Sequence, residues 1–262
     1  MDCRVQKDTA EQHINQALDL IAQQQYDKAL LECNTAITLD PKSARAYGIR
    51  AFTYNSKGQY DLSIADGTKA IGLNPNLAAI YTNRALAYNA KGQYDLGIAD
   101  CTRAIELDPK DAEAYTNRSF AYNNLGKYDQ SITDSTKAIE LDPNIADAYN
   151  NRAWAYFGLE KWDPGILDSN KAIALAPNKA EPYANRAYAY VNLSKYDQAI
   201  ADCNTAIKIN PGFAASYSTR GFAYSYIGRK TEAIADLTKF ITLENDPRQI
   251  ENARQRIKEL TK

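Results

Sequence analysis

Residues 78–111 read AAIYTNRALAYNAKGQYDLGIADCTRAIELDPKD, and this stretch carries the pattern that decides the fold. The pattern returns every 34 residues and is marked most clearly by prolines, at Pro41, Pro75, Pro109, Pro143, Pro177 and Pro211. Aligned on these prolines, the repeats begin at Ala10, Ala44, Ala78, Ala112, Ala146, Ala180 and Ala214. A period of this length indicates one supersecondary unit that buries its core against its neighbours. We therefore expect seven stacked repeats and an elongated binding surface.

Each repeat is predicted to contain two helices. In residues 78–111, Tyr81, Ala85 and Tyr88 recur at helical spacing and predict the buried stripe of the first helix. Gly92 predicts the end of that helix, because glycine adopts the left-handed conformation that a helix C-terminus needs. Asp95 is then predicted to cap the second helix. Other repeats keep this glycine, at Gly58, Gly126 and Gly228. Two repeats replace it, with Glu160 and Ser194.

The repeat resembles the tetratricopeptide family over residues 10–247. The family consensus W-x2-L-G-x2-Y, then A-x3-F, then P is matched by Tyr81, Ala85, Tyr88, Gly97, Cys101, Ala104 and Pro109. The resemblance implies an all-α fold, an α-solenoid in which antiparallel helix pairs stack into a right-handed superhelix. It also implies that the first helices line a concave groove.

The two ends of the chain differ from the repeats. Residues 1–9 form an N-terminal extension, and Thr9 with Gln12 can make a capping box on the first helix of residues 10–247. Residues 248–262 are predicted to form a C-terminal capping helix with one apolar stripe, made by Ile250, Ala253, Ile257 and Leu260.

Composition excludes several classes of partner. The chain has 31 Lys plus Arg against 32 Asp plus Glu, without a long run of one sign, so nucleic acid is not expected as a partner. No apolar run approaches the ~20 residues that span a bilayer, so membrane insertion is not expected. The first thirty residues lack a secretory signal, which favours a cytoplasmic location. An export signal removed earlier would leave the same sequence.

Chemistry-bearing residues are few and mostly follow the repeat. Cys33, Cys101 and Cys203 share one position, which Ser135 and Ser169 fill in other repeats, so these thiols read as small packing residues. Cys3 precedes the repeats and has no assigned role. With one histidine and no phosphate-binding glycine loop, we expect no catalytic residues, no metal site, no cofactor and no enzymatic activity.

Six arginines recur in the first helices, and an aspartate follows each of them sixteen residues later. The pairs are Arg50–Asp66, Arg84–Asp100, Arg118–Asp134, Arg152–Asp168, Arg186–Asp202 and Arg220–Asp236. A row of arginines can bind a ligand, but one aspartate per arginine in fixed register favours ion pairs between the two helices of a repeat. In the first repeat, Gln16 and Glu32 have the same spacing.

The remaining face of the first helices carries asparagines in one row, Asn83, Asn117, Asn151 and Asn185. Asparagine is a mediocre helix former, whereas its amide can both donate to and accept from the backbone of an extended peptide. The row is similar to the asparagine ladder of the superhelix in O-linked N-acetylglucosamine transferase. Asn89 and Asn123 extend the amide supply on this face. Inheritance of the row by duplication is the alternative.

Large aromatic residues lie beside the amides at a second position, Phe52, Phe120, Trp154, Tyr188 and Phe222, with Phe157 nearby. Aromatic groups on a solvated face mark interaction surfaces, although some can wedge between adjacent helices. Trp154 and Phe157, flanked by Asn150 and Asn151, form the favoured patch.

Charge on this face narrows the ligand. Glu11, Glu113, Asp147 and Glu181 oppose Arg45 alone, and one positive against four negative charges gives a net of minus three. The leading prediction is therefore a protein-interaction scaffold whose groove binds an extended, neutral-to-basic peptide segment. The alternatives are homo-oligomerisation, in which the groove of one copy accepts a terminal helix of another, and a role as the targeting array of a larger protein.

Overall fold

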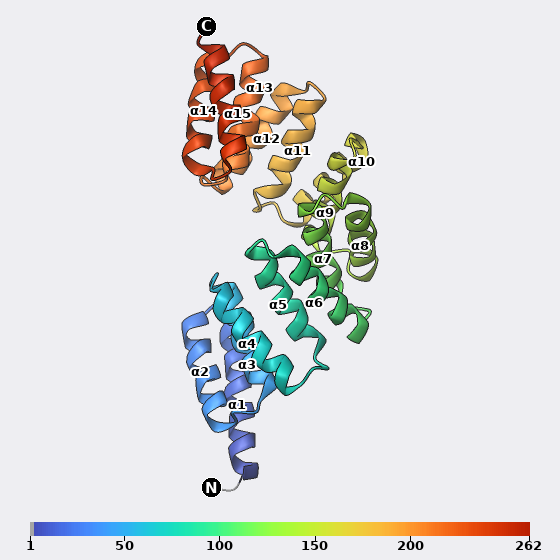
Figure 1. Cartoon of the computed structure of the whole chain (residues 1–262), viewed down its shortest axis with the longest axis vertical. Helices are drawn as coiled ribbons and strands as arrows, with labels where there is room; N and C mark the ends of the chain where they lie inside the picture. The colour runs from blue at the N-terminus through green and yellow to red at the C-terminus, as the bar shows by residue number, and fades with distance from the viewer. Residues whose placement is uncertain (1–2) are drawn as a thin grey trace. The chain divides into compact units, whose positions relative to one another are not determined.

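The structure is a computed structural model that describes residues 3–262, with side chains from Thr9 onward. Every regular element in residues 3–262 is an α-helix (Figure 1). The chain divides into two compact units, an N-terminal module of residues 1–141 and a C-terminal module of residues 142–262. We describe each module by itself. The side chain of Cys3 lies outside the described part.

The N-terminal module contains four helix pairs. Its helices are α1 (Cys3–Ala22), α2 (Tyr26–Leu39), α3 (Ala44–Ser56), α4 (Tyr60–Leu73), α5 (Ala78–Ala90), α6 (Tyr94–Leu107), α7 (Ala112–Asn124) and α8 (Tyr128–Leu141). Each first helix packs on the second helix of its own repeat, and α3, α5 and α7 also pack on that of the preceding repeat. The first helices α1, α3, α5 and α7 also contact one another in succession, so they share one face of the module.

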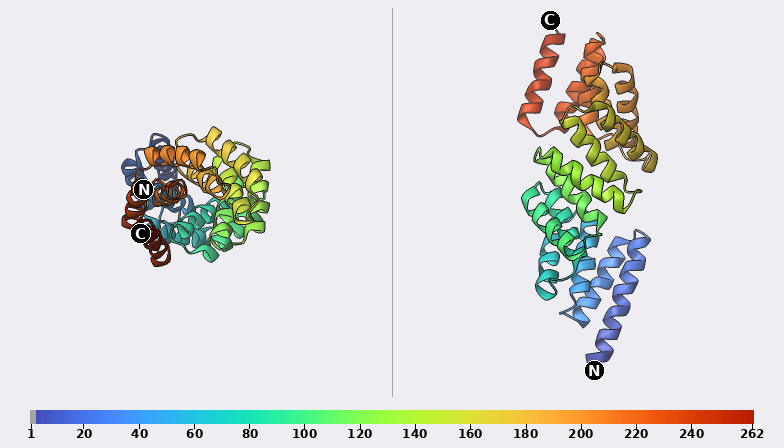
Figure 2. Two further views of the ribbon diagram at one scale, coloured as in Figure 1. Left: turned by 90° about the horizontal axis from the view of Figure 1, so that it is seen from above. Right: turned by 90° about the vertical axis from the view of Figure 1, so that its right-hand side faces the viewer.

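The C-terminal module contains three helix pairs and a final helix. Its helices are α9 (Ala146–Gly158), α10 (Trp162–Leu175), α11 (Glu181–Asn192), α12 (Tyr196–Ile209), α13 (Ala214–Tyr226), α14 (Lys230–Leu243) and α15 (Pro247–Leu260). The first helices α9, α11 and α13 contact one another in succession. Figure 2 shows α15 as the last, red helix, and its buried Ala253 packs with Leu237 and Phe240 of α14. A helix thus follows the last helix pair of the module.

The first helices end at the glycine position of the repeat, as the sequence predicted. Gly58, Gly92, Gly126 and Gly228 have φ between 69° and 78°, in the left-handed region. Gln24, Glu160 and Ser194 fill the same position and adopt φ of 57° to 58°. Packing on the next helix therefore imposes the turn even where the side chain does not favour it.

Two helix starts differ from the sequence predictions. The second helices begin one residue before the aspartates, and their N-cap residues in α2, α4, α6, α10 and α12 make no side-chain cap bond. Asp95 and its equivalents therefore lie in the first turn, where a carboxylate favours the helix dipole without capping. The capping box of Thr9 and Gln12 is also wrong, because α1 begins at Cys3 and Thr9 lies inside it.

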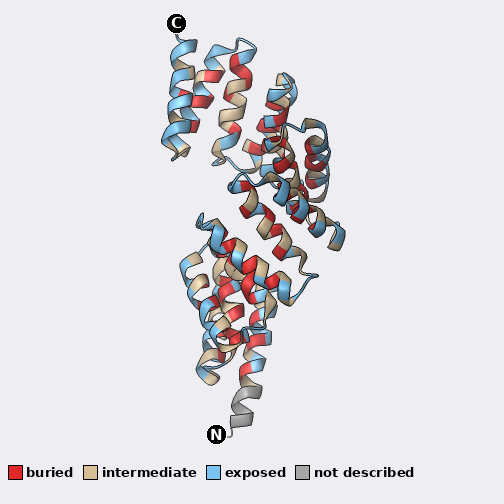
Figure 3. Ribbon diagram, turned by 45° about the vertical axis from the view of Figure 1, so that its right-hand side comes forward, coloured by how far each residue is buried: buried red, intermediate tan, exposed pale blue. Residues whose placement is uncertain are grey.

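The core is built from small residues where helices of adjacent layers meet. Figure 3 shows buried positions recurring along the helices of both modules. Cys33, Cys101 and Cys203 are buried beside alanines such as Ala29 and Ala199. The interpretation of these thiols as packing residues is confirmed.

The arginine and aspartate pairs form as predicted. In all six, the arginine Nε and Nη2 donate to the two carboxylate oxygens over 2.6–2.9 Å. Each guanidinium also lies 5.4–6.0 Å from one or two tyrosine ring centroids. Hydrogen bonds donated to Asp100 raise the pKa of Arg84, and those donated to Asp168 raise the pKa of Arg152. The arginines are therefore committed to the framework.

The same arginines also join successive repeats. Arg50 Nη1 donates to Asn34 Oδ1 over 2.7 Å, and Arg84 Nη1 donates to Thr68 Oγ1 over 2.9 Å, in both cases to the second helix of the preceding repeat. In the first repeat the partner of Glu32 is His13, whose Nδ1 lies 2.6 Å from Glu32 Oε2.

Candidate functional site

A row of large apolar side chains occupies one position of the first helices. Six of its members expose 37–42% of their surface, and Phe222 is half-buried. The N-terminal module contributes Leu18, Phe52, Leu86 and Phe120, and the C-terminal module contributes Trp154, Tyr188 and Phe222. Five of these were predicted. Leu18 and Leu86 occupy the same position of the 34-residue repeat, although the predicted site included only its aromatic members.

The asparagine row lies one turn away and is only partly open. Asn83 and Asn117 are half-buried, and Asn151 is buried. The Nδ2 of Asn185 donates to Asn150 Oδ1 over 2.9 Å, which holds the two amides together on the face shared by α9 and α11. The row is thus present, with its members exposed to different degrees.

The two extra amides lie in the interior. Asn89 is buried, and its Nδ2 donates to the backbone oxygen of Asn117 over 2.8 Å; Asn55 makes the same bond to Asn83 over 2.7 Å. Asn123, at the same position of the next repeat, is buried too. These side chains tie adjacent first helices together, so we do not include Asn89 and Asn123 in the candidate surface.

Phe157 is also an interior residue. It is 3% exposed and stacks on Trp162, with the ring centroids 6.0 Å apart. Gly165 makes this possible, since a Cβ atom there would lie 2.3 Å from Phe157 Cε1. Phe157 therefore lies in the core, which does not agree with the prediction that it lines the groove.

The C-terminal module presents what we call the aromatic patch, made by Asn150, Trp154, Asn185 and Tyr188. The rings of Trp154 and Tyr188 lie 5.8 Å apart at 45°, and Trp162 supports Tyr188 from 6.2 Å. Aromatic pairs at this separation stabilise each other and hold fixed orientations. The patch therefore combines two open rings with two hydrogen-bonded amides.

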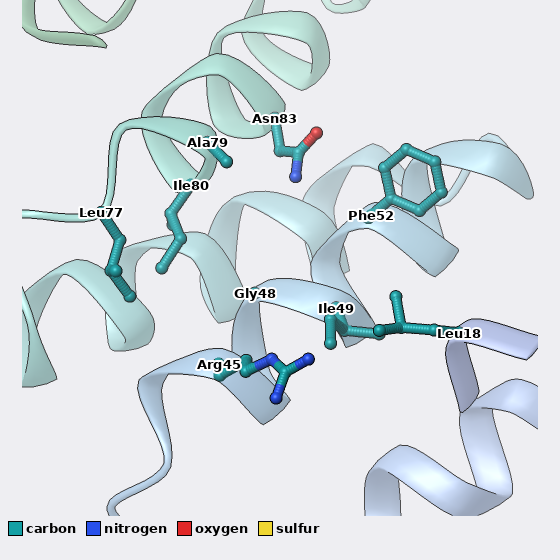
Figure 4. Close-up of a pocket in the computed structure, with 9 residues that line it drawn as sticks. All are labelled: Leu18, Arg45, Gly48, Ile49, Phe52, Leu77, Ala79, Ile80 and Asn83. Carbon is teal, nitrogen blue, oxygen red and sulfur yellow. The ribbon is translucent and has the colours of Figure 1, made fainter. Parts of the chain in front are cut away.

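The N-terminal module presents a different feature, which we call the apolar hollow. It has a volume of about 470 Å³ and is lined by Leu18, Arg45, Gly48, Ile49, Phe52, Leu77, Ala79, Ile80 and Asn83. Figure 4 shows these residues surrounding a central space, with the Asn83 amide and the Arg45 guanidinium as the polar groups at its margin. Sequence reasoning missed this hollow.

Charges on this face are more balanced than the sequence count indicated. Arg45 pairs with Glu11 and lies 3.4 Å from Asn15 Oδ1, and Lys179 donates to both Asp147 carboxylate oxygens over 2.6 and 2.8 Å. Two of the four acidic residues are thus ion-paired. Counting Lys179 gives two positive against four negative charges, a net of minus two.

Between residues 3 and 262, no helix is long and apolar enough to cross a membrane. Within the same range, no cluster of three His, Cys, Asp or Glu side chains is arranged to hold a metal ion.

Comparison with known proteins identifies the repeat. Models described as tetratricopeptide repeat, or TPR repeat, match residues 14–78, 78–111, 101–133, 121–159, 180–213 and 214–247. Comparison with curated proteins gives no match.

Solved structures of the same fold align along much of the chain. A tetratricopeptide repeat protein from Parabacteroides merdae is 19% identical with a TM-score of 0.70, covering 97% of this chain and 100% of its own. Cut9, from the APC/C hetero-tetramer Cut9-Hcn1, is 18% identical with a TM-score of 0.84, covering 94% of this chain and 48% of its own.

A third structure, YrrB, is described as a TPR protein with an unusual peptide-binding site. It is 23% identical with a TM-score of 0.51, covering 72% of this chain and 97% of its own. The repeats of this fold generally act as scaffolds for protein–protein interaction. With family models matching most of its length and stacked helix pairs in both modules, this chain belongs to the tetratricopeptide repeat family.

Proposed function

We propose that this chain is a non-enzymatic scaffold that binds an extended, neutral-to-basic peptide segment on its first-helix face. The row of large apolar side chains is the observation that carries the proposal. Six of its members, from Leu18 to Tyr188, keep about 40% of their surface in water at one position of successive repeats. A stacked repeat gains no stability from that exposed area, whereas a docked ligand would cover it.

Amides beside the row supply the polar contacts that an extended peptide needs. Every main-chain N–H and C=O removed from water must find a partner, and an amide side chain offers both a donor and an acceptor. Asn185 and Asn150 already hold each other beside Trp154 and Tyr188. A peptide main chain can bond the remaining amide atoms of this pair while its side chains contact the rings.

Charge favours a neutral or basic segment. The counted charges give a net of minus one in each module, and the ion pairs among them are Arg45 with Glu11 and Lys179 with Asp147. Exposed charges of this kind act mainly on association rate and on the choice of partner. A strongly acidic segment would be repelled, so its affinity is expected to be lower and to rise with salt.

The test is selection from a library of dodecapeptides with acetylated N-termini and amidated C-termini, followed by calorimetry on the purified chain. Trp154→Ala should weaken the selected peptides by roughly 1 to 3 kcal/mol, because an aromatic residue at an interface centre dominates binding. The matched control is Leu167→Ala on α10, which removes a 69% exposed apolar side chain of the same module from a second helix. It should leave affinity unchanged.

Two results would contradict the proposal. One is the absence of any selected binder, and the other is equal loss of affinity in both variants. A collapse of thermal stability in Trp154→Ala would assign that side chain to the framework. Circular dichroism melting of both variants therefore accompanies the binding measurement.

A further inference from the structure

We propose that the apolar hollow of the N-terminal module is an anchoring pocket for a bulky uncharged side chain, aliphatic or aromatic, of the bound peptide. This inference rests on the proposed function and names the ligand chemistry at one place on that face. Three observations support it: the apolar lining of the hollow, the departures from the repeat that create the hollow, and the ion pair that holds Arg45, the cation in its lining.

Departures from the repeat converge on the hollow. Ile49 replaces the asparagine that Asn83 and Asn117 keep in the next two repeats, and Ile80 replaces the alanine seen at Ala46 and Ala114. Gly48 opens the space between them, because a Cβ atom there would lie 3.2 Å from Ile80 Cγ1. Each change makes this spot either more apolar or more open.

Leu77 adds a fourth departure, and it occupies the N-cap of α5 without a capping bond. In the neighbouring repeats of the module, Ser43 accepts from Ala46 N over 3.2 Å and Asp111 accepts from Ala114 N over 2.9 Å. Ile145 and Phe213 are also apolar N-caps, in the C-terminal module, so a missing cap is not in itself a sign of function. Leu77 is informative because its side chain lines the hollow beside Ile80 (Figure 4).

The lining determines which side chain can enter. Arg45 is held by Glu11 and Asn15, and Asn83 is the remaining polar group. A charged or strongly polar side chain would lose its hydration there without gaining a partner, whereas an apolar one gains by leaving water. The volume of about 470 Å³ falls within the roughly 300–1,000 Å³ of ordinary ligand sites. Asn83, at the margin, can bond the main chain next to the buried side chain.

A first experiment uses the hollow without any selected peptide. The methyl-labelled chain of residues 1–262 is titrated with N-acetyl-leucine methylamide and followed by NMR, with the acetylated methylamides of aspartate and lysine as matched probes. Saturable shifts of the Ile49, Leu77 and Ile80 methyl groups with the leucine probe alone are expected. Equal shifts with all three probes, or none with the leucine probe, would overturn the inference.

A second experiment removes the hollow with residues that the repeat uses elsewhere. The double variant Ile49→Asn plus Leu77→Asp restores the asparagine position and adds a capping carboxylate, but it also removes the Ile49 side chain that packs against Ile14 and Ala17. Melting is therefore measured to show that the variant is folded at the temperature of the binding experiments. The leucine probe should no longer shift the Ile80 methyl groups, which the variant retains, and selected peptides should bind about tenfold more weakly. Replacing the anchoring residue of such a peptide with serine should weaken binding to the wild-type chain about tenfold and to the variant hardly at all.

The outcomes separate the two proposals. Peptides that bind wild-type chain and double variant equally, yet lose affinity with Trp154→Ala, would refute the anchoring pocket and keep the proposed function. Failure to select any peptide would refute the proposed function, and the leucine-probe titration would still decide on the hollow.

Discussion

The apolar hollow and the aromatic patch are made at equivalent positions of two pairs of repeats, yet they differ in chemistry. The two sites share three equivalent positions, Gly48 and Asn150, Phe52 and Trp154, and Asn83 and Asn185. Ile49 of the hollow corresponds to Asn151 beside the patch, and Tyr188 of the patch corresponds to Leu86 beside the hollow. In the first set an isoleucine and a glycine produce an open apolar space, and in the second two hydrogen-bonded amides and two rings produce a patterned surface. The repeat thus determines where side chains lie, and a few substitutions determine what they bind.

What the two regions share is the framework on the opposite face of the same helices. Arg84 stands behind the hollow and Arg152 behind the patch, each with a bidentate aspartate bond. This common support is why binding chemistry can vary without loss of the fold. The two modules are therefore expected to respond alike when the same framework residue is changed in each.

The largest expected effect is the loss of an arginine from the framework. Arg84→Ala and Arg152→Ala should each lower the free energy of unfolding by about 3 kcal/mol, because Asp100 or Asp168 is left as a mostly buried charge without its partner. Urea unfolding followed by circular dichroism measures both. Arg103→Ala, which removes an exposed i,i+3 pair with Glu106, is the control and should leave stability nearly unchanged. Unequal losses in the two modules would contradict a shared framework.

The next largest effect concerns pH and the buried thiols. Burial raises the pKa of Cys33 to about 12, and burial also raises that of Cys203 above its ordinary value. Above about pH 9, the unfolded thiol ionises while the folded one stays protonated, so stability should fall as pH rises, by about 1.4 kcal/mol per pH unit and thiol.

Cys33→Ser and Cys203→Ser test this in the two modules, because serine already fills the position at Ser135 and Ser169. Each variant should reduce the slope of unfolding free energy against pH between 9 and 11 by the contribution of one thiol. Urea titrations at three pH values suffice. An unchanged slope in both variants would show that the thiols remain protonated in the unfolded chain too, or ionise in the folded one.

A third prediction concerns the packing of Phe157 against Gly165. Gly165→Ala should destabilise the chain by about 1–3 kcal/mol, since the added methyl group overlaps the Phe157 ring in a packed interior. Gly72→Ala on α4 is the matched control, because its Cβ atom would meet nothing within 4 Å. That variant should be more stable by roughly 0.5–1 kcal/mol through helix propensity alone. Thermal melting measures both variants, and stability changes of the same sign would contradict the packing argument.

The smallest expected effect is a reciprocal exchange within the apolar row. Tyr188→Leu should weaken a library-selected peptide bound at the aromatic patch by about 0.5–1.5 kcal/mol, because Trp154 loses an aromatic neighbour at 5.8 Å. Leu86→Tyr makes the opposite change in the N-terminal module and should not weaken binding. Calorimetry on both variants measures the difference, and equal effects would mean that ring contact at this position is unimportant.

Much of the framework was readable from the sequence because it repeats. A pairing such as Arg84 with Asp100 occurs six times at one spacing, and a spacing seen six times predicts an ion pair better than one seen once. All six ion pairs form. The left-handed turn at Gly92 is likewise repeated. Predictions of helix caps fared worse, both for the repeated aspartates such as Asp95 and for the first helix. The capping box at Thr9 failed because the helix continues past it toward the N-terminus.

The candidate sites were less predictable for the same reason. Phe157 lies at the position that Asn89 and Asn123 fill in the N-terminal module, and a large side chain there goes inward only because Gly165 leaves room. The hollow depends on Gly48, Ile49, Leu77 and Ile80, which come from two repeats and meet only after packing. A linear pattern records such departures without indicating that they converge.

The sequence by itself determined the number of repeats, the two helices in each, the glycine turns and the ion pairs, because these depend on local spacing and on contacts repeated between neighbours. Only the tertiary structure decided which amides and rings face water. Whether a side chain at a given position is buried depends on the volume of the residue opposite it on another helix. In this chain that opposing residue, such as Gly165 behind Phe157 or Gly48 beside Ile80, divides the framework from the surface proposed to bind a ligand.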